Sequence, residues 1–189
     1  MITNETLRVI KQRRSNRSFC AEQITDDELQ AVLEAGQYAP HAGDQAWHFT
    51  VVQNRDVLER LNRAATETAL RVEMGFLSQL ARLPGFHCLH HAPTLIIVSG
   101  DERAPMPLDA DCAAANENML IAAESLGLGA CWVFFVALAF GSPEGAAFRK
   151  ELKLPEGYQP KAALVLGYKQ DDAPIPAPER KPGLVTIIR

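Results

Sequence analysis

Three arginines and a serine lie within five residues near the start of the chain, where they could bind a phosphate group. Ser15 is surrounded by Arg13, Arg14 and Arg17. A guanidinium group pairs with phosphate oxygens through two parallel hydrogen bonds, and a serine hydroxyl adds a neutral donor. Taken alone, however, such a cluster is more typical of a positively charged turn in solvent.

A second candidate segment joins a turn of small and polar residues to an aromatic strand, Trp-His-Phe, at residues 47–49. The turn contains Pro40, His41, Ala42, Asp44 and Gln45. It could present backbone groups and polar side chains to a planar heterocycle. The simpler alternative is an ordinary loop in which the aromatic residues enter the core.

Three histidines form a local group that resembles a metal site. His87, His90 and His91 have a spacing that would bring them together on a helix, and Cys88 lies between them. Prolines bracket the segment, however, and no matching set of carboxylates is evident. We therefore predict no metal site here and interpret the histidines as surface or pocket-lining residues.

Several common enzyme motifs are absent. Gly127-Leu128-Gly129 is half of a dinucleotide-binding fingerprint and follows a helix instead of a strand, so we do not expect a Rossmann site. There is no Walker A sequence and no G-x-S-x-G elbow.

The composition predicts one soluble domain over residues 1–189. The chain has a formal net charge of -4, which makes nucleic acid an unexpected partner. No apolar run approaches the ~20 residues of a membrane helix, and the start shows no signal pattern. Its four cysteines are scattered, as expected for a reducing cytoplasm.

Helical patterns predominate, and they alternate with a few strands. We expect strands at residues 47–52, 94–98 and 162–166, and a long helix at 109–126. The first helix should be capped by Thr3 or Asn4 and carry Leu7 and Ile10 on its inner face, and other helices should begin after Thr25, Asn54 and Ser142. Thr25 and Glu28 have the spacing of a capping box. This pattern predicts an α+β or α/β fold with three layers.

The C-terminal segment combines prolines with a final apolar stretch. Pro174, Pro176, Pro178 and Pro182 prevent a helix, and residues 184–188 have the character of a strand. A strand that extends away from its own body is often received by a second subunit.

Taken in order, these segments resemble the nitroreductase family of flavin mononucleotide (FMN)-dependent oxidoreductases. The resemblance covers essentially the whole chain. It rests on Arg-Arg-Ser-x-Arg-x-Phe at 13–19, the turn before Trp47, the helix containing Asn118, residues 124–132, Leu-Gly-Tyr at 166–168 and the tail at 176–182. No single motif is specific, but their shared order is.

The resemblance implies a nitroreductase-like α/β/α sandwich with a mainly antiparallel sheet and a C-terminal strand exchanged in a homodimer. It also implies non-covalent FMN at the subunit interface, with NAD(P)H as the reductant of a ping-pong reaction. The implied contacts to the phosphate and ribityl chain are Arg13, Arg14, Ser15, Arg17, Arg180 and Lys181. Those implied near the flavin ring are Pro40, His41, Ala42, Asp44, Gln45, Asn118, Cys131, Trp132 and Val133. No catalytic side chain is implied.

The sequence departs from the family pattern at the ring end of this implied site. The turn before Trp47 is one residue shorter, with His41 in place of serine and Asp44 in place of asparagine. Phe134 and Phe135 follow Val133 where glycine is common, and two bulky rings would narrow the substrate face. The expected function is reduction of a small organic acceptor such as a nitro compound, quinone or enone. The alternative is an FMN store or sensor without turnover.

Overall fold

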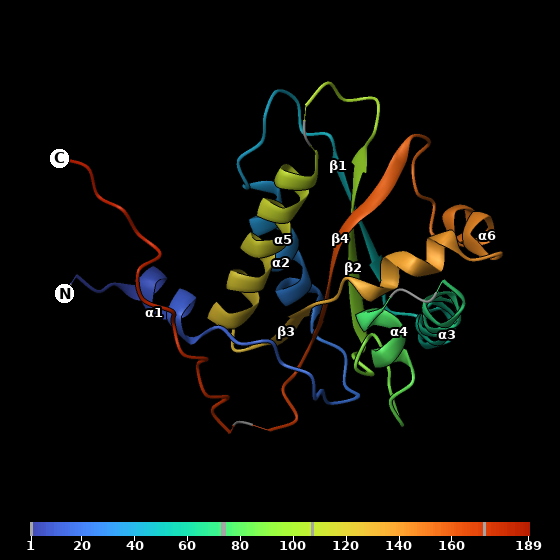
Figure 1. Cartoon of the computed structure of the whole chain (residues 1–189), viewed down its shortest axis with the longest axis horizontal. Helices are drawn as coiled ribbons and strands as arrows, with labels where there is room; N and C mark the ends of the chain where they lie inside the picture. The colour runs from blue at the N-terminus through green and yellow to red at the C-terminus, as the bar shows by residue number, and fades with distance from the viewer. Residues whose placement is uncertain (1, 73–74, 107, 172) are drawn as a thin grey trace.

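A four-stranded sheet lies between two layers of helices (Figure 1). The computed structural model describes residues 2–72, 75–106, 108–171 and 173–189. The spatial order of the strands is β1-β2-β4-β3, and every neighbouring pair is antiparallel. Their bounds are Trp47–Val52 for β1, Thr94–Asp101 for β2, Gly129–Trp132 for β3 and Tyr158–Gly167 for β4. The predicted three-layer sandwich with an antiparallel sheet is therefore confirmed.

Each face of the sheet is covered by its own set of helices (Figure 1). One layer contains α1 (Glu5–Gln12), α2 (Asp26–Gln37) and α5 (Leu108–Ser125). The other contains α3 (Arg55–Arg71), α4 (Phe76–Ala81), the 3-10 helix η1 (Phe135–Gly141) and α6 (Gly145–Glu151). Among the described residues, no helix combines the length and the apolar character that a membrane crossing requires.

The alternation of β2 side chains produces two separate cores. Ile96 and Val98 pack with α2 and α5, whereas Leu95 and Ile97 pack with α3 and η1. Successive side chains of a strand point to opposite faces, so a strand buried on both faces is apolar throughout. The apolar run at 94–98 therefore occupies the central position that its sequence predicts.

The helix starts follow from local capping. The side chain of Thr25 accepts a hydrogen bond from the backbone of Glu28, whose carboxylate accepts one in return from Thr25. The side chains of Asn4 and Asn54 each accept one backbone hydrogen bond and so cap α1 and α3. In contrast, α6 begins at Gly145, because the Ser142 hydroxyl accepts from the Glu144 N–H within a preceding turn.

The predicted inner face of α1 is wrong for the single chain. Val9 is its buried residue, whereas Leu7 and Ile10 are 36% and 47% exposed. The helix lies against α5 through one narrow stripe, so its remaining apolar side chains stay open to solvent. The apolar pattern of α1 therefore indicates two packing faces, of which one is covered here.

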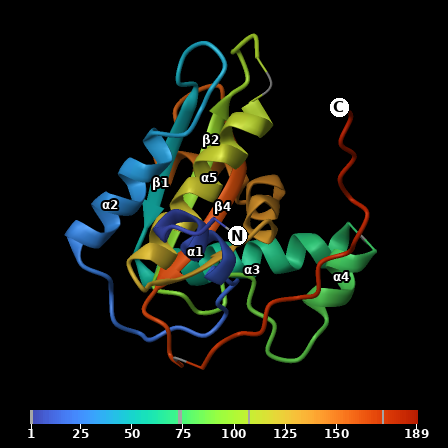
Figure 2. The same ribbon diagram turned by 90° about the vertical axis from the view of Figure 1, so that its left-hand side faces the viewer.

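The C-terminal residues 173–189 form an extended arm that leaves the body (Figure 2). Every residue of this segment is exposed, and the predicted strand at 184–188 is unpaired within the single chain. The exposed surface of the chain is 11,439 Å². A compact monomer of 20.7 kDa would expose roughly 8,900 Å². The excess reflects the arm and leaves its apolar side chains without cover.

Replacing Gly36 with valine should destabilise the fold by about 1–3 kcal/mol. A Cβ at this position would lie 2.9 Å from Met119 Cγ and 3.0 Å from Phe49 Cε2, so α2 could no longer approach α5 as closely. Urea denaturation measures the change. Gly141→Ala is the control, because a Cβ there meets nothing within 4 Å. Equal stability of the two variants would contradict this account of helix packing.

Candidate functional site

Asn16 fastens the segment 13–17 to the outer edge of β3. Its backbone N–H donates to the Ala130 carbonyl at 2.9 Å, and its side-chain Nδ2 donates to the Ser18 carbonyl at 2.7 Å. Ser15 forms a parallel bridge with Ala130. A Cβ on Gly129 would lie 2.6 Å from Asn16 Nδ2, so glycine permits this close approach. Sequence reasoning missed Asn16, although it stands between residues that were selected.

The segment runs extended beside β3, so its side chains alternate between two sides. Arg13, Ser15 and Arg17 are close enough to Cys131 to act on its thiol. Burial raises the pKa of this thiol, while Arg17, a hydrogen bond from Ser15, and Arg13 act in the opposite direction. The structure thus brings together three of the predicted phosphate contacts and one predicted ring neighbour.

Arg13 is held beside α5. Its Nε lies 3.5 Å from Glu117 Oε1, and both side chains remain partly exposed. Exposed ion pairs of this kind contribute little to stability, so the guanidinium is free to exchange its partner for a more strongly charged one. Arg17 makes a long contact of 3.4 Å from Nη1 to the Ser15 carbonyl.

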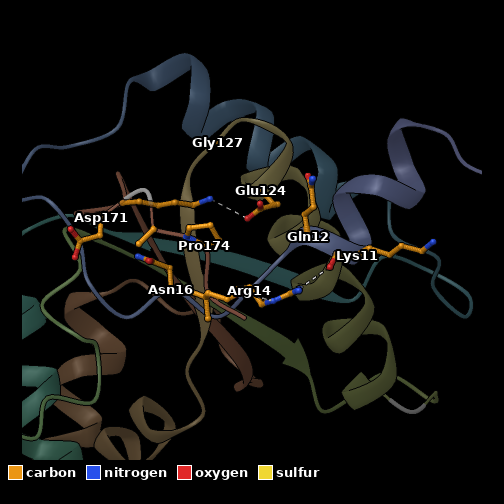
Figure 3. Close-up of a pocket in the computed structure, with 11 residues that line it drawn as sticks. Lys11, Gln12, Arg14, Asn16, Glu124, Gly127, Asp171 and Pro174 are labelled. Carbon is orange, nitrogen blue, oxygen red and sulfur yellow. Dashed lines mark hydrogen bonds and ion pairs between the residues drawn. The ribbon is translucent and has the colours of Figure 1, made fainter. Parts of the chain in front are cut away.

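Arg14 points to the other side of the segment, toward the arm (Figure 3). Its Nε donates to the Ile175 carbonyl at 3.1 Å, and its Nη1 donates at 2.8 Å to the carbonyls of Lys11 and Arg13. Together with Asn16 it lines a cavity of about 480 Å³ beneath the arm. The structure therefore does not bring Arg14 together with Arg13, Ser15 and Arg17.

The exit of β3 presents two aromatic side chains to solvent. Cys131 and Val133 are buried, whereas Trp132 is 39% and Phe134 is 60% exposed. Phe135 points into the core instead, where its ring centroid lies 4.9 Å from that of Phe86. The expectation that both phenylalanines narrow an open face is therefore wrong for Phe135, and of the two only Phe134 is exposed.

The turn before β1 contacts the N-terminal end of α5. The Ala42 N–H donates to Asp111 Oδ2 at 3.1 Å, in the first turns of that helix. Ala42 and Asp44 lie on the same short turn, in which Pro40, His41, Asp44 and Gln45 are exposed. Gln45 Nε2 donates to the Gln37 carbonyl at 2.9 Å. Within one chain, the turn and the segment 13–17 remain apart.

Asn118, Arg180 and Lys181 complete the predicted site residues, and the first two form hydrogen bonds within the chain. Asn118 Nδ2 donates to the Ala35 carbonyl at 3.1 Å and thereby ties α5 to α2. Arg180 and Lys181 are exposed on the arm, where Arg180 Nη1 donates to the Pro178 carbonyl at 3.1 Å. Both residues belong to the extended arm 173–189 (Figure 2).

Comparison with known proteins shows which family this chain belongs to. A family model described as the nitroreductase family matches residues 10–168. The chain belongs to the nitroreductase family. A relative from Archaeoglobus fulgidus carries the name NADH dehydrogenase/NAD(P)H nitroreductase. It is 32% identical, and the alignment covers 89% of this chain and 87% of the relative. The predicted family is thus confirmed.

Two solved structures of nitroreductases with bound FMN share this fold. The protein from Bacteroides fragilis is 38% identical, with a TM-score of 0.88 over 99% of this chain and 100% of that chain. The protein from Desulfitobacterium hafniense is 30% identical, with a TM-score of 0.88 over the full length of both chains. This nitroreductase therefore matches them along its entire length, including the arm.

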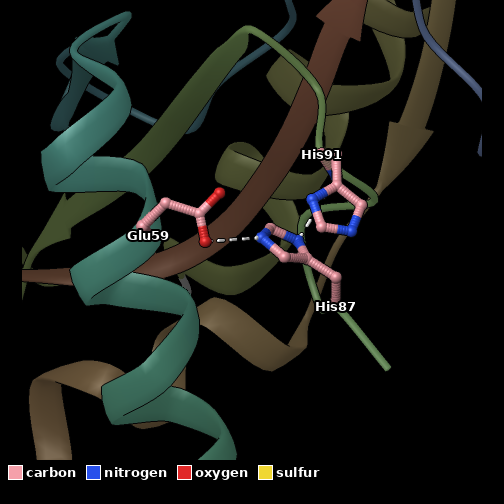
Figure 4. Close-up of side chains that lie close together, drawn as sticks. All are labelled: Glu59, His87 and His91. Carbon is pink, nitrogen blue, oxygen red and sulfur yellow. Dashed lines mark hydrogen bonds and ion pairs between the residues drawn. The ribbon is translucent and has the colours of Figure 1, made fainter. Parts of the chain in front are cut away.

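Glu59, His87 and His91 form a cluster on the other face of this nitroreductase (Figure 4). Their potential ligand atoms lie within 4.8 Å of one another. The segment is a series of turns, with left-handed backbone at His90 and His91, and the carboxylate comes from α3. The helical arrangement that we considered is thus wrong, and the carboxylate lies 28 residues upstream of His87.

The hydrogen bonds of His87 argue against a metal ion at this cluster. Its Nδ1 accepts the N–H groups of Leu89 and His91, both at 3.2 Å, so the ring proton is on Nε2. Nε2 lies 3.3 Å from Glu59 Oε2. A metal-bound histidine has the opposite pattern, in which one nitrogen gives its lone pair to the metal and the other donates its N–H. We infer that this cluster closes the loop before β2 by hydrogen bonding.

The stability of this nitroreductase should fall as the pH decreases from 6.5 towards 4. Burial, followed by Arg17, His87 and His91, lowers the pKa of His90 from 6.5 to about 4. The unfolded chain then binds protons that the folded chain resists, so this stability is present above pH 6.5 and is lost on acidification. His90→Asn keeps a residue that tolerates left-handed backbone and removes the titration.

Urea denaturation at pH 7 and pH 5 measures this effect. The loss of stability between the two pH values should be smaller in His90→Asn than in the unmodified chain. His41→Asn serves as the control, because His41 lies on the exposed turn before β1. An unchanged pH dependence in His90→Asn would show that His90 does not carry it.

Proposed function

We propose that this chain is an FMN-dependent oxidoreductase that uses NAD(P)H, by a ping-pong mechanism, to reduce a small organic acceptor. Nitro compounds, quinones and enones are the candidate acceptors. The observation that carries the proposal is the attachment of the segment 13–17 to the edge of β3, where Ser15 bridges Ala130 and Arg13 lies beside Glu117 of α5. The FMN-bound relatives support the choice of cofactor.

The side chains of Arg13, Ser15 and Arg17 fit a phosphate and a ribityl chain. Two guanidinium groups neutralise a phosphate dianion, and the Ser15 hydroxyl donates a further hydrogen bond. The Arg13–Glu117 pair is loose and exposed, so little is lost when Arg13 turns to a phosphate. FMN, when bound, supplies the chemistry of hydride transfer, and the protein supplies charge and orientation.

The ring end of the site requires a second copy of the chain. The turn that contains Pro40, His41, Ala42, Asp44 and Gln45 lies apart from the segment 13–17 of its own chain. In a homodimer, that turn would border the ring held by the partner, and Arg180 and Lys181 would reach the partner through the exchanged arm. Cys131, Val133 and Asn118 are occupied by packing or hydrogen bonds and would shape the site indirectly.

Trp132 and Phe134 would form the wall of the substrate face. Their exposure beside the buried Cys131 and Val133 places two aromatic rings on the open side of the β3 exit. Aromatic rings stack with planar, apolar molecules and exclude water from them. We therefore propose planar acceptors, with Phe134 limiting their width.

Anaerobic reduction tests the proposed function. The purified protein should be yellow or should bind added FMN, and NADH or NADPH should bleach it in the absence of oxygen. A subsequent addition of a quinone or nitro compound should restore the colour. Steady-state rates measured against both substrates should give parallel double-reciprocal lines.

Two results would contradict the proposal in different ways. Protein that is colourless and does not bind added FMN would refute the cofactor assignment. Protein whose flavin resists both reduced nicotinamides would instead support the alternative, an FMN store or sensor. Phe134 motivates that alternative, because its exposed ring would obstruct a nicotinamide if it lay over the flavin.

A further inference from the structure

The root of the arm is joined to the segment that follows the arginine cluster. The Cys20 N–H donates to the Tyr168 carbonyl at 3.0 Å, and the Gln170 N–H donates to the Ser18 carbonyl at 3.2 Å. The Ser18 hydroxyl also donates to Gln170 Oε1 at 2.8 Å. These bonds end at Gln170, so they hold the start of the arm but not its later course.

Arg14 makes the next hydrogen bond to the arm, five residues further along the chain (Figure 3). Its Nε donates to the Ile175 carbonyl, while Nη1 is held by the carbonyls of Lys11 and Arg13. The carbonyls of Lys11 and Arg13 thus fix the guanidinium plane, and the Nε–H is directed at the arm. A charged donor of this kind forms a stronger hydrogen bond to a carbonyl oxygen than a neutral donor does.

The alternation of side chains along the segment 13–17 supports a different role for Arg14 from that of its neighbours. Arg13, Ser15 and Arg17 lie beside Cys131, whereas Arg14 and Asn16 line the cavity on the other side. Lys169 and Glu124 are 3.3 Å apart in the same cavity and neutralise each other there. A phosphate held by Arg13 and Arg17 would therefore lie on the side away from Arg14.

We propose that Arg14 is a positioning residue that anchors the C-terminal arm and leaves the phosphate to Arg13 and Arg17. The proposal rests on the proposed FMN-binding homodimer. A chain of five residues spans at most about 18 Å, so an anchor at Ile175 limits where Arg180 and Lys181 of the arm can reach. Arg14 would act on the partner's site through the direction of the arm.

Trypsin cleavage after Arg180 tests this role in the FMN-loaded protein. The peptide bond after Arg180 should become more accessible to trypsin when the arm is no longer held by Arg14. Fragment 1–180 is quantified by mass. Arg14→Lys and Arg14→Gln should both raise the initial cleavage rate about 10-fold, since each loses a charged hydrogen bond to a carbonyl. Lysine keeps the charge but lacks the fork, so an anchor should fail equally in both variants.

FMN affinity, measured by fluorescence titration, separates the anchor from a phosphate contact. Arg14→Lys and Arg14→Gln should weaken FMN binding equally, because both act through the arm, whereas the control Arg13→Gln should weaken it at least about 10-fold without faster arm cleavage. The proposal would be overturned in favour of a phosphate contact if Arg14→Gln weakened FMN binding, Arg14→Lys kept it, and neither variant changed the cleavage rate. Unchanged cleavage with unchanged affinity would also overturn it.

The same measurements distinguish a wrong anchor from a wrong cofactor site. If Arg13→Gln binds FMN as tightly as the unmodified chain, the proposed cofactor site fails, whatever the cleavage rates show. Circular dichroism of both Arg14 variants checks that they fold, and cleavage of the folded core would appear as fragments other than 1–180. Faster release of fragment 1–180 alone therefore reports the arm.

Discussion

Replacing both Arg13 and Arg17 with glutamine is expected to weaken FMN binding by two to four powers of ten. Hydrogen bonds to charged groups contribute about 1.5–3 kcal/mol each, and every 1.4 kcal/mol changes a dissociation constant about tenfold. Both side chains are close enough to Cys131 to act on its thiol, and in the proposed site they would share one phosphate. The loss should therefore approach the sum of two charged contacts.

Riboflavin is the internal control, because it lacks the phosphate. The unmodified protein should prefer FMN to riboflavin strongly, and the double variant should bind both with similar affinity. Salt provides a second readout, since screening weakens the interaction of FMN with the arginines but not that of riboflavin with the ring site. The double variant should thus lose most of the salt dependence. A preserved preference for FMN would contradict the proposed phosphate site.

The double variant should remain folded. Arg13 forms one loose, exposed pair with Glu117, and Arg17 makes a long contact to a backbone carbonyl, so their removal leaves no buried charge alone. Arg63→Gln, an exposed residue of α3 on the other face of the sheet, is the matched control for loss of positive charge. Its FMN affinity should equal that of the unmodified protein.

Helix starts and strands that depend on interactions between neighbouring residues could be predicted from the sequence. The Thr25–Glu28 capping box and the Asn54 cap satisfy N–H groups within three residues, so they mark helix starts wherever the chain folds. The apolar run at 94–98 could be assigned to the sheet centre because burial on both faces leaves no polar position. In contrast, the run 130–140 has no period that separates a strand from a helix, and β3 with η1 was missed.

The candidate site was predictable only in part, since its parts are joined by long-range contacts. The residue types at 13–17 indicate a phosphate site only together with the motifs that follow them in family order. Their alternation could have separated Arg14 from Arg13 and Arg17 had an extended conformation been assumed. Nothing local indicates that Glu59 meets His87 or that Arg14 meets Ile175. The exposed Leu7 and Ile10 of α1 show the same limit, because an apolar pattern does not reveal which of its positions the chain itself covers.

Replacing Leu184, Val185, Ile187 and Ile188 together with serine is expected to convert the proposed homodimer into a monomer. These side chains are 69–93% exposed in the single chain, which is unusual for four apolar residues within five positions. Burial of one such side chain stabilises an assembly by about 1.5–3 kcal/mol, so their combined loss should weaken dimerisation more than about 1,000-fold. Sedimentation velocity over a range of protein concentrations measures the change.

Loss of the dimer should also abolish tight FMN binding, because the ring would lose the partner's turn, Arg180 and Lys181. The monomer should keep its own fold, since 184–188 contributes no buried residue to either core. Thr186→Ser is the control within the same segment and should leave both dimer and FMN affinity unchanged. A variant that stays dimeric would place the interface elsewhere, on the half-buried outer side of α5 and on Leu7 and Ile10 of α1. The exchanged arm would then be dispensable for assembly, although it could still carry Arg180 to the cofactor.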